Sequence, residues 1–263
     1  MRCLLVLVAA AAFAVGGAAA APPPHGIVHV QVPPGTPLRE LGYQLYAANC
    51  ISCHGVDGRG VSPPAPSRGA GHITGAGPPL RGVGALAADF YLRTGYMPLG
   101  SVDTQPWRGT VLFSDREINA LVAYVASLGN GPAIPTVHPD RGSLSEGLRL
   151  FTEHCAGCHQ VVARGGYLTG ARVPPLDEAT PRQIVEAVRI GPYLMPRFSR
   201  NAVSDRELDS IVRYVEHSRH PTDRGGWGIG HLGPIPEGMV TWFVAALVLV
   251  ALCVVFVRKL SDE

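Results

Sequence analysis

Two short motifs in this sequence combine thiols with an imidazole at identical spacing. Each has the pattern Cys-x-x-Cys-His, and the motifs comprise Cys50, Cys53 and His54, and Cys155, Cys158 and His159. The pattern is typical of covalent attachment of a c-type haem. Two thiols on one helical turn can reach two vinyl groups of one porphyrin, and the next residue then faces the iron. The sequence therefore predicts two covalently bound haem c groups, with His54 and His159 as proximal iron ligands.

Other chemistries are compatible with paired cysteines. The four thiols could together bind one zinc ion, or each pair could form a disulfide in an oxidising compartment. Both are less consistent with the sequence, because a histidine directly follows each pair and each pair lies in its own copy of a repeat. The remaining cysteines, Cys3 and Cys253, lie in apolar runs near the chain ends. We favour haem and keep zinc and disulfides as alternatives.

Two methionines are the candidates for the second axial ligand of each iron. Of four methionines, Met1 is the initiator and Met239 begins an apolar run. The other two, Met97 and Met195, each precede a proline and occupy matching places in the repeat. A thioether is a soft ligand that binds haem iron and raises its reduction potential. Among the histidines outside the motifs, His72 is the substitute if Met97 is not a ligand.

Three blocks of sequence occur twice in the same order. The first copy reads ELGYQLYAANCISCHGVDGRG, PPLRGVGALAADFYLRTGYMP and FSDREINALVAYVASLG; the second reads SEGLRLFTEHCAGCHQVVARGG, PPLDEATPRQIVEAVRIGPYLMP and VSDRELDSIVRYVEHSR. Apolar residues recur at helical spacing in both. Ser114 and Ser204 each precede a helix with glutamate three residues on, a pattern typical of a capping box. Neither copy shows the alternation typical of a strand.

Both ends of the chain are apolar. Residues 1–21 have the composition of a secretory signal peptide or an uncleaved N-terminal anchor. Residues 239–258 are long and apolar enough to cross a bilayer as a helix. Arg258 and Lys259 end that run, and the positive-inside rule then places the C-terminus in the cytoplasm. The repeat is therefore expected outside the cytoplasm, anchored at the cell membrane by its C-terminal helix.

The composition limits the function classes. The chain has 263 residues, a formal net charge of +2 and 46% hydrophobic residues, so neither a disordered chain nor a nucleic-acid partner is expected. The fold class that we predict is all-α, with two tandem cytochrome c-like domains and one C-terminal transmembrane helix. The domains are residues 38–129 and 144–219. Proline- and glycine-rich linkers, residues 130–143 and 220–238, follow them.

The order of these features resembles one family. Two tandem CxxCH domains, the segment GGWGIGHLGPIPEGM and a single C-terminal apolar helix are similar to the dihaem cytochrome c subunit of the bcc complex of high-GC Gram-positive bacteria. The resemblance covers residues 38–258. CxxCH alone is shared with every c-type cytochrome, whereas the tandem order, GPIPEGM and the helix are more specific. The basic stretch often found before the first apolar run of that family is missing here.

The resemblance implies an electron-transfer subunit of a menaquinol:cytochrome c reductase, beside a cytochrome b subunit and a Rieske iron–sulfur subunit. One haem would take electrons from the Rieske centre, and the other would pass them to a cytochrome c oxidase. The subunit would have no substrate pocket of its own. A free-standing membrane-anchored dihaem cytochrome c that serves another oxidase or dehydrogenase is the alternative. A dihaem peroxidase is a further one, which the matched Met-Pro pairs disfavour because it needs an open iron position.

The two copies differ in the loop that follows the methionine. This loop is longer in the first copy and contains Gln105, Trp107 and Arg108. We hypothesise that it docks a partner, because tryptophan and arginine are typical interface anchors. A tolerated surface insertion is the alternative.

Overall fold

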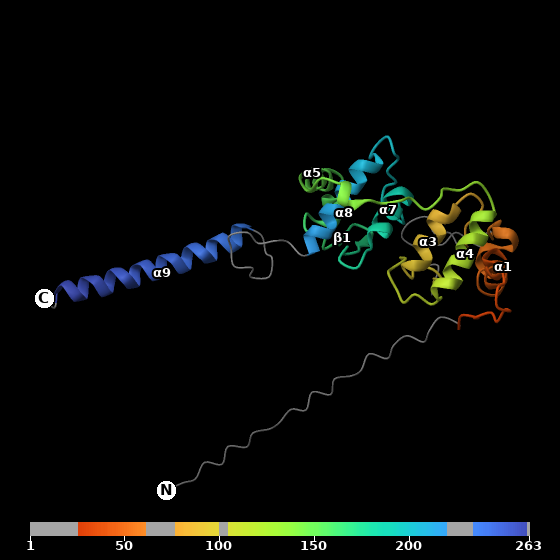
Figure 1. Ribbon diagram of the computed structural model, residues 1–263, viewed down its shortest axis with the longest axis horizontal. Helices are drawn as coiled ribbons and strands as arrows, with labels where there is room; N and C mark the ends of the chain where they lie inside the picture. Colours follow the sequence, from red (N-terminus) through yellow and green to blue (C-terminus); the bar gives the residue numbers. More distant parts are fainter. Residues whose placement is uncertain (1–25, 62–76, 100–104, 220–233, 262–263) are drawn as a thin grey trace, which may run out of the picture.

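The computed structural model describes residues 26–61, 77–99, 105–219 and 234–261. Three features predicted from the sequence lie outside these ranges: the signal peptide or anchor at residues 1–21, the alternative ligand His72 and most of the linker 220–238. Within the described residues, the chain forms two helical domains joined in tandem and a separate C-terminal helix (Figure 1). The predicted all-α fold class is confirmed.

In its described residues, the first domain is built from four α-helices and one 3-10 turn. They are α1 (Leu38–Asn49), α2 (Ile51–His54), η1 (Val56–Gly58), α3 (Gly84–Arg93) and α4 (Asp115–Ser127). Helix α1 packs across α4. A glycine makes this close approach possible, because a Cβ at Gly42 would lie 1.9 Å from the Ala120 carbonyl oxygen. Leu45, Ile118 and Leu121 are fully buried at this contact, and burial of such side chains is the main stabilising contribution to a small domain.

The second domain repeats this plan with an added hairpin. Its elements are η2 (Pro139–Arg141), α5 (Leu144–His154), α6 (Ala156–His159), β1 (Gly166–Leu168), β2 (Ala171–Val173), α7 (Pro181–Ile190) and α8 (Asp205–Arg219). Helix α5 packs across α8. The contact again depends on a glycine, because a Cβ at Gly147 would lie 2.0 Å from the Ser210 carbonyl oxygen. The two copies of the repeat thus form their central helix pair in the same way.

The two predicted capping boxes are present. At the start of α4, the Ser114 hydroxyl accepts from the Glu117 amide at 3.4 Å, and the Glu117 carboxylate accepts from the Ser114 amide at 2.8 Å. At the start of α8, the corresponding distances between Ser204 and Glu207 are 3.3 and 2.8 Å. Each box supplies partners for amides that the first helical turn leaves free, and such a cap is worth about 1 kcal/mol.

The expectation that neither copy contains a strand is wrong for the hairpin of β1 and β2. These two strands pair antiparallel, with Gly166 opposite Val173 and Leu168 opposite Ala171. Each strand has 3 residues, which is too short to display a period of two in the sequence. The turn between them includes Gly170 at a φ of +86°, a conformation that glycine adopts readily.

The start of the first linker packs against the first domain. The Leu86 amide donates to the Pro132 carbonyl at 3.1 Å, and a Cβ at Gly131 would lie 2.1 Å from the Gly84 nitrogen. Helices α3 and α7 then meet at the junction of the two domains, as the tandem arrangement in Figure 1 shows.

Helix α9 (Pro234–Ser261) projects away from both domains (Figure 1). Its segment Gly238–Ser261 has a mean hydropathy of 2.9 in its most apolar window, and none of that window is buried within the chain. Among the described residues, this is the one helix long and apolar enough to cross a membrane. It contains the predicted transmembrane segment 239–258, and Arg258 and Lys259 lie in its last turn.

Candidate haem-binding sites

Each Cys-x-x-Cys-His motif forms one tight helical turn at the end of a long helix. The His54 amide donates to the Cys50 carbonyl at 2.8 Å, and the His159 amide donates to the Cys155 carbonyl at 2.9 Å. Helix α2 and helix α6 each end at the histidine. The turn gathers both thiols and the imidazole of a motif onto one short segment, as attachment of a single porphyrin requires.

A proline carbonyl orients each histidine. His54 Nδ1 lies 2.8 Å from the Pro78 carbonyl oxygen, and His159 Nδ1 lies 3.1 Å from the Pro174 carbonyl oxygen. A carbonyl only accepts hydrogen bonds, so Nδ1 carries the hydrogen in both rings. The lone pair of each Nε2 is then free for a metal, and an orienting partner of this kind is usual for histidines that bind metals.

The chain returns to each motif in the same way. The Leu80 amide donates to the Gly58 carbonyl at 2.8 Å, and the Leu176 amide donates to the Ala163 carbonyl at 2.9 Å. These bonds hold the Pro-Pro-Leu segment of each copy beside its histidine. Its backbone contacts are therefore equivalent in the two domains.

Burial affects the first thiol of each motif. Burial, reinforced by the neighbouring thiol of each pair, raises the pKa of Cys50 to about 12 and that of Cys155 to about 11. Redox-active and zinc-binding cysteines are usually thiolates with lowered pKa values. The five cysteines of the described residues are free of disulfides. In the same residues, no three His, Cys, Asp or Glu side chains gather into a candidate metal site.

Each candidate methionine follows a helix of its own domain. Met97 comes after α3, and its amide donates to the Tyr91 carbonyl at 3.1 Å; Met195 comes after α7, and its amide donates to the Pro192 carbonyl at 3.0 Å. Both side chains are half-buried. A glycine turns the chain between helix and methionine in both domains, because Gly95 and Gly191 each have a φ of +67°. Ligation of iron by these methionines remains a prediction.

The tyrosines near the methionines differ between the domains. Tyr96 is buried and packs edge-on against Phe90, with ring centroids 5.6 Å apart. It forms an aromatic group with Phe90 and Tyr91 of α3. Tyr193 is half-buried, and its hydroxyl donates to the Gly170 carbonyl at 3.5 Å. It therefore links the methionine segment to the hairpin.

The histidines differ in exposure. His159 is 9% exposed, whereas His54 is only half-buried. Burial lowers the pKa of His159, against a smaller opposing effect of the Pro174 carbonyl. The buried ring is therefore held neutral, which is the form that binds a metal.

The long loop of the first copy contacts the second domain. The Gln105 side-chain amide donates to the Arg172 carbonyl at 2.6 Å and accepts from the Arg172 amide at 2.9 Å. The Arg172 guanidinium lies 3.9 Å from the centre of the Trp107 ring. Arg108 donates to the Gln183 side chain at 2.7 Å. The interface anchors were recognised in the sequence, but their partner in the structure is the same chain, and Arg172 and Gln183 were not foreseen.

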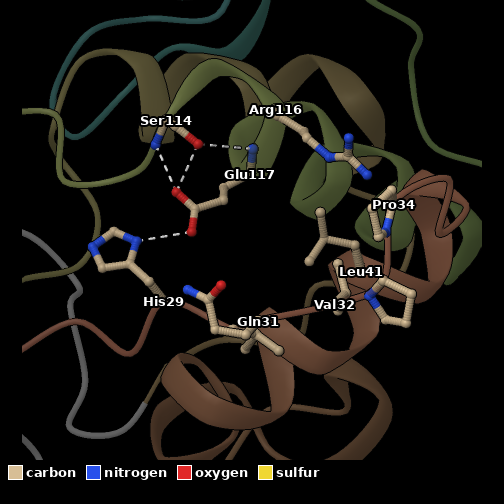
Figure 2. A pocket seen from close by; sticks show the side chains of 10 residues that line it. His29, Gln31, Val32, Pro34, Leu41, Ser114, Arg116 and Glu117 are labelled. Atoms are coloured by element: carbon tan, nitrogen blue, oxygen red, sulfur yellow. Dashed lines mark hydrogen bonds and ion pairs between the residues drawn. The ribbon is translucent and has the colours of Figure 1, made fainter.

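A separate hollow lies where the segment before α1 crosses the start of α4 (Figure 2). His29 Nδ1 lies 2.8 Å from a Glu117 carboxylate oxygen, and Ser114 donates to the other oxygen. Burial acts to raise the pKa of Glu117, but hydrogen bonds from His29 and Ser114 outweigh it and lower the pKa. The hollow includes no predicted haem residue, and its carboxylate is already used as a helix cap.

Comparison with known proteins matches both domains to cytochromes. Residues 40–129 match the family described as Cytochrome c, and residues 142–215 match the family described as Cytochrome C oxidase, cbb3-type, subunit III. The cytochrome bc1 complex cytochrome c subunit of Corynebacterium diphtheriae is 36% identical over 230 residues, which are 80% of this chain and 77% of that protein.

Two further proteins are similar to this chain at lower identity. The cytochrome bc1 complex cytochrome c subunit of Mycobacterium tuberculosis is 34% identical over 225 residues, which are 82% of this chain and 76% of that protein. The Cbb3-type cytochrome c oxidase subunit CcoP of an Azospirillum species is 28% identical over 207 residues, covering 67% of this chain and 60% of that protein.

Proposed function

The chain belongs to the family of cytochrome c subunits of actinobacterial cytochrome bc1 complexes, and from this premise we propose that it carries two haem c groups through which electrons cross a quinol-oxidising respiratory complex. Membership supports a cytochrome c role in electron transfer. The proposal adds the count of haems, their ligands and the direction of electron flow.

The residues of the two sites fit a haem in each domain. Cys50 and Cys53 would attach the first haem, and Cys155 and Cys158 the second. The observation that carries this assignment is the contact between each motif histidine and a proline carbonyl, at 2.8 and 3.1 Å. It orients each ring and leaves its Nε2 for an iron.

Each haem would supply one-electron exchange when bound. The chain would hold His54 and Met97 on the two faces of the first haem, and His159 and Met195 on the faces of the second. Filled axial positions leave no place for a substrate at iron, which favours transfer of electrons over oxygen or peroxide chemistry.

The partners follow from the complex. A cytochrome b subunit and a Rieske iron–sulfur subunit would be neighbours in the membrane, with the Rieske centre as electron donor and a cytochrome c oxidase as acceptor. Helix α9 would anchor the chain in membrane lipid, with both domains on the extracytoplasmic side. Anchoring raises the local concentration of the haems at their partners.

A spectrum of the full chain in detergent tests the haem assignment. We expect two c-type haems per chain by pyridine haemochrome, and a methionine-to-iron charge-transfer band in the oxidised protein. Met97→His and Met195→His should each remove half of that band and lower one midpoint potential. A single haem per chain, or a band that survives both substitutions, would contradict the assignment.

The second domain's match to a cbb3-type oxidase subunit supports a second candidate, a carrier that serves an oxidase directly. Purification in mild detergent distinguishes the two candidate functions. Recovery of a b-type cytochrome and an iron–sulfur signal with the chain is expected if it belongs to a quinol-oxidising complex. Recovery with an oxidase alone would favour the second candidate.

A further inference from the structure

Two acidic side chains are buried where the domains meet. Asp89 lies on α3 and Glu186 lies on α7, and their exposed fractions are 1% and 0%. Neither residue belongs to a haem motif. Carboxylates are rarely buried unless paired with a cation or hydrogen-bonded, because removing the charge from water is costly.

The hydrogen bonds at this junction leave three carboxyl oxygens without a donor. Arg93 donates from Nε to Asp89 Oδ1 at 2.9 Å. Asp89 Oδ2 and both oxygens of Glu186 have no hydrogen-bond partner. Arg182 Nε is 3.6 Å from an oxygen of each carboxyl, which is an ion-pair distance and too long for a good hydrogen bond.

A proton on one of the two carboxyls satisfies these atoms. A protonated carboxyl donates, and an ionised one accepts, so a single proton converts two facing acceptors into a hydrogen-bonded pair. The two carboxyls face the same cation, because Arg182 Nε is 3.6 Å from Asp89 Oδ2 and 3.6 Å from Glu186 Oε1. Burial, followed by the charge of Asp89, raises the pKa of Glu186 to about 8. The pair therefore holds one proton at neutral pH.

When Glu186 is protonated, the positive and negative charges around the pair are balanced. Arg93 comes from α3 and also donates to Asp115 at 2.6 Å on α4, and Arg182 comes from α7. With Glu186 neutral, these two guanidinium groups oppose two carboxylates, Asp89 and Asp115. Ionisation of Glu186 would add a third negative charge.

The helices that carry the pair lead directly to the candidate iron ligands. Helix α3 runs into the Met97 segment, which bonds back to Tyr91, and α7 runs into the Met195 segment. The Gln183 side chain on α7 adds a donor to the Arg93 carbonyl at 3.2 Å. A change in how α3 packs on α7 would therefore move both methionine segments relative to each other.

We propose that Asp89 and Glu186 share one proton at the domain junction and act as a positioning pair, which holds the two haem-bearing domains in the arrangement needed for electron transfer between them. This inference rests on the proposed function, because it takes both domains to carry haem. It concerns the packing of the chain's own helices and assigns no step to the cofactor.

The pair makes the closed junction depend on pH. If the helices separate, Glu186 meets water and its pKa returns to the ordinary value of 4.5, from about 8 in the closed junction. Between these values the closed state binds more protons, so closure weakens as pH rises. The closing constant should fall by up to tenfold per pH unit in this window. Above about pH 8 it should stay constant, because Glu186 is ionised in both states.

Two measurements on the full chain in detergent, with its haems attached, test the pair. Infrared absorption should show the carbonyl stretch of a protonated carboxyl at pH 6.5, and titration should remove it with a midpoint near 8. Glu186→Gln should abolish the band, and Asp89→Asn should move its midpoint to lower pH. Glu178→Gln, at an exposed glutamate of the same domain, is the matched control and should change neither.

Hydrogen exchange gives the second readout. In peptides from α3 and α7, the ratio of exchange in the parent chain to that in Glu186→Gln should rise between pH 6 and 8, by up to tenfold per unit, and then level off. Peptides from α1 and α8 should keep a constant ratio. A missing carbonyl band, or a ratio that does not change with pH, would overturn the proposal.

The haem spectrum of the same samples keeps the two proposals apart. Two haems with methionine bands and a junction insensitive to pH would overturn the positioning pair alone. A junction that responds to pH in a chain with one haem would overturn the proposed function, and with it the role of the pair in electron transfer.

Discussion

The two domains share one frame around the motif histidine but differ in how closely they bury that residue. Both have the same motif turn, the same histidine contact and the same helix crossing at a glycine. The difference lies beside the histidine. Gly77 precedes the Pro-Pro-Leu segment in the first domain, and buried Val173 of the hairpin takes that place in the second.

Because of this difference, the two sites share their proposed ligands but differ in how far water can reach the histidine. A Cβ at Gly77 would lie 2.7 Å from His54 Nδ1, so the first domain has no room for a larger residue there. His159 is more buried than His54. Solvent exposure is one determinant of haem potential, and burial disfavours the more highly charged ferric state. Two sites with the same proposed ligands can therefore differ in haem potential, and we expect the potential of the second to be higher.

Removing a histidine should have the largest effect. His54→Ala and His159→Ala should each abolish the low-spin signal of one haem, because the iron loses its proximal nitrogen. Electron paramagnetic resonance of the oxidised chain should show two distinct low-spin species, of which each variant retains a different one. Loss of the same species in both variants would contradict the division into two sites.

An added methyl group at the glycine of either helix crossing should destabilise its domain by a similar amount. Gly42→Ala and Gly147→Ala each place a methyl group about 2 Å from a backbone oxygen. Forced separation of the helices should destabilise each domain by about 3 kcal/mol. Thermal unfolding followed at the haem bands should show similar losses. Gly26→Ala, which has open space around it and lies outside both motifs, is the control. A large effect in one domain only would show that the crossings are not equivalent.

Substituting the residues beside the histidines should alter the difference in potential between the two haems. Val173→Gly removes a buried side chain from the second domain and should cost about 2 kcal/mol. It should also lower the potential of the second haem by admitting water. Gly77→Ala should disturb the His54 contact and weaken ligation in the first domain. Redox titration of both haems measures the change; a second potential that stays constant in Val173→Gly would contradict the role of enclosure.

The helix caps should give the smallest effect. Both Glu117 and Glu207 have lowered pKa values: burial opposes the hydrogen bonds in Glu117, whereas the Ser204 amide is the main cause in Glu207. Their contribution to stability is therefore present above the unfolded pKa of 4.5 and is lost as pH falls through the lower folded value. Glu117→Gln and Glu207→Gln should flatten this acid limb. If both variants lost stability at acid pH as the parent chain does, the contribution of the caps to stability would be contradicted.

Local patterns in the sequence predicted most of the frame. These patterns are local: each involves residues a few positions apart in the sequence. They are the CxxCH spacing, the capping residues and the apolar period of the helices, and all are visible in the sequence alone. The family resemblance, found through the tandem order and the segment before α9, is confirmed by the curated relatives. The positions of the methionines came from comparing the two copies, and their ligation remains a prediction.

The junction could not be predicted in the same way. Asp89 and Glu186 stand among helix residues in which a surface charge is usual, and only the packing of α3 on α7 buries them. Trp107 and Arg108 had the composition of an interface, but composition does not identify a partner. Arg172 lies in a hairpin whose strands are too short to show a pattern. These features depend on contacts between distant parts of the chain.

The packed linker has a consequence for how an electron would pass along the chain. Residues 131 and 132 contact the start of α3, and the loop at Gln105 and Trp107 contacts the second domain. The domains are therefore already in contact and need no diffusional search to meet. With haem in both domains, the rate of the step between them should be independent of solvent viscosity. Viscosity should instead slow the encounter with whatever protein takes the electron next.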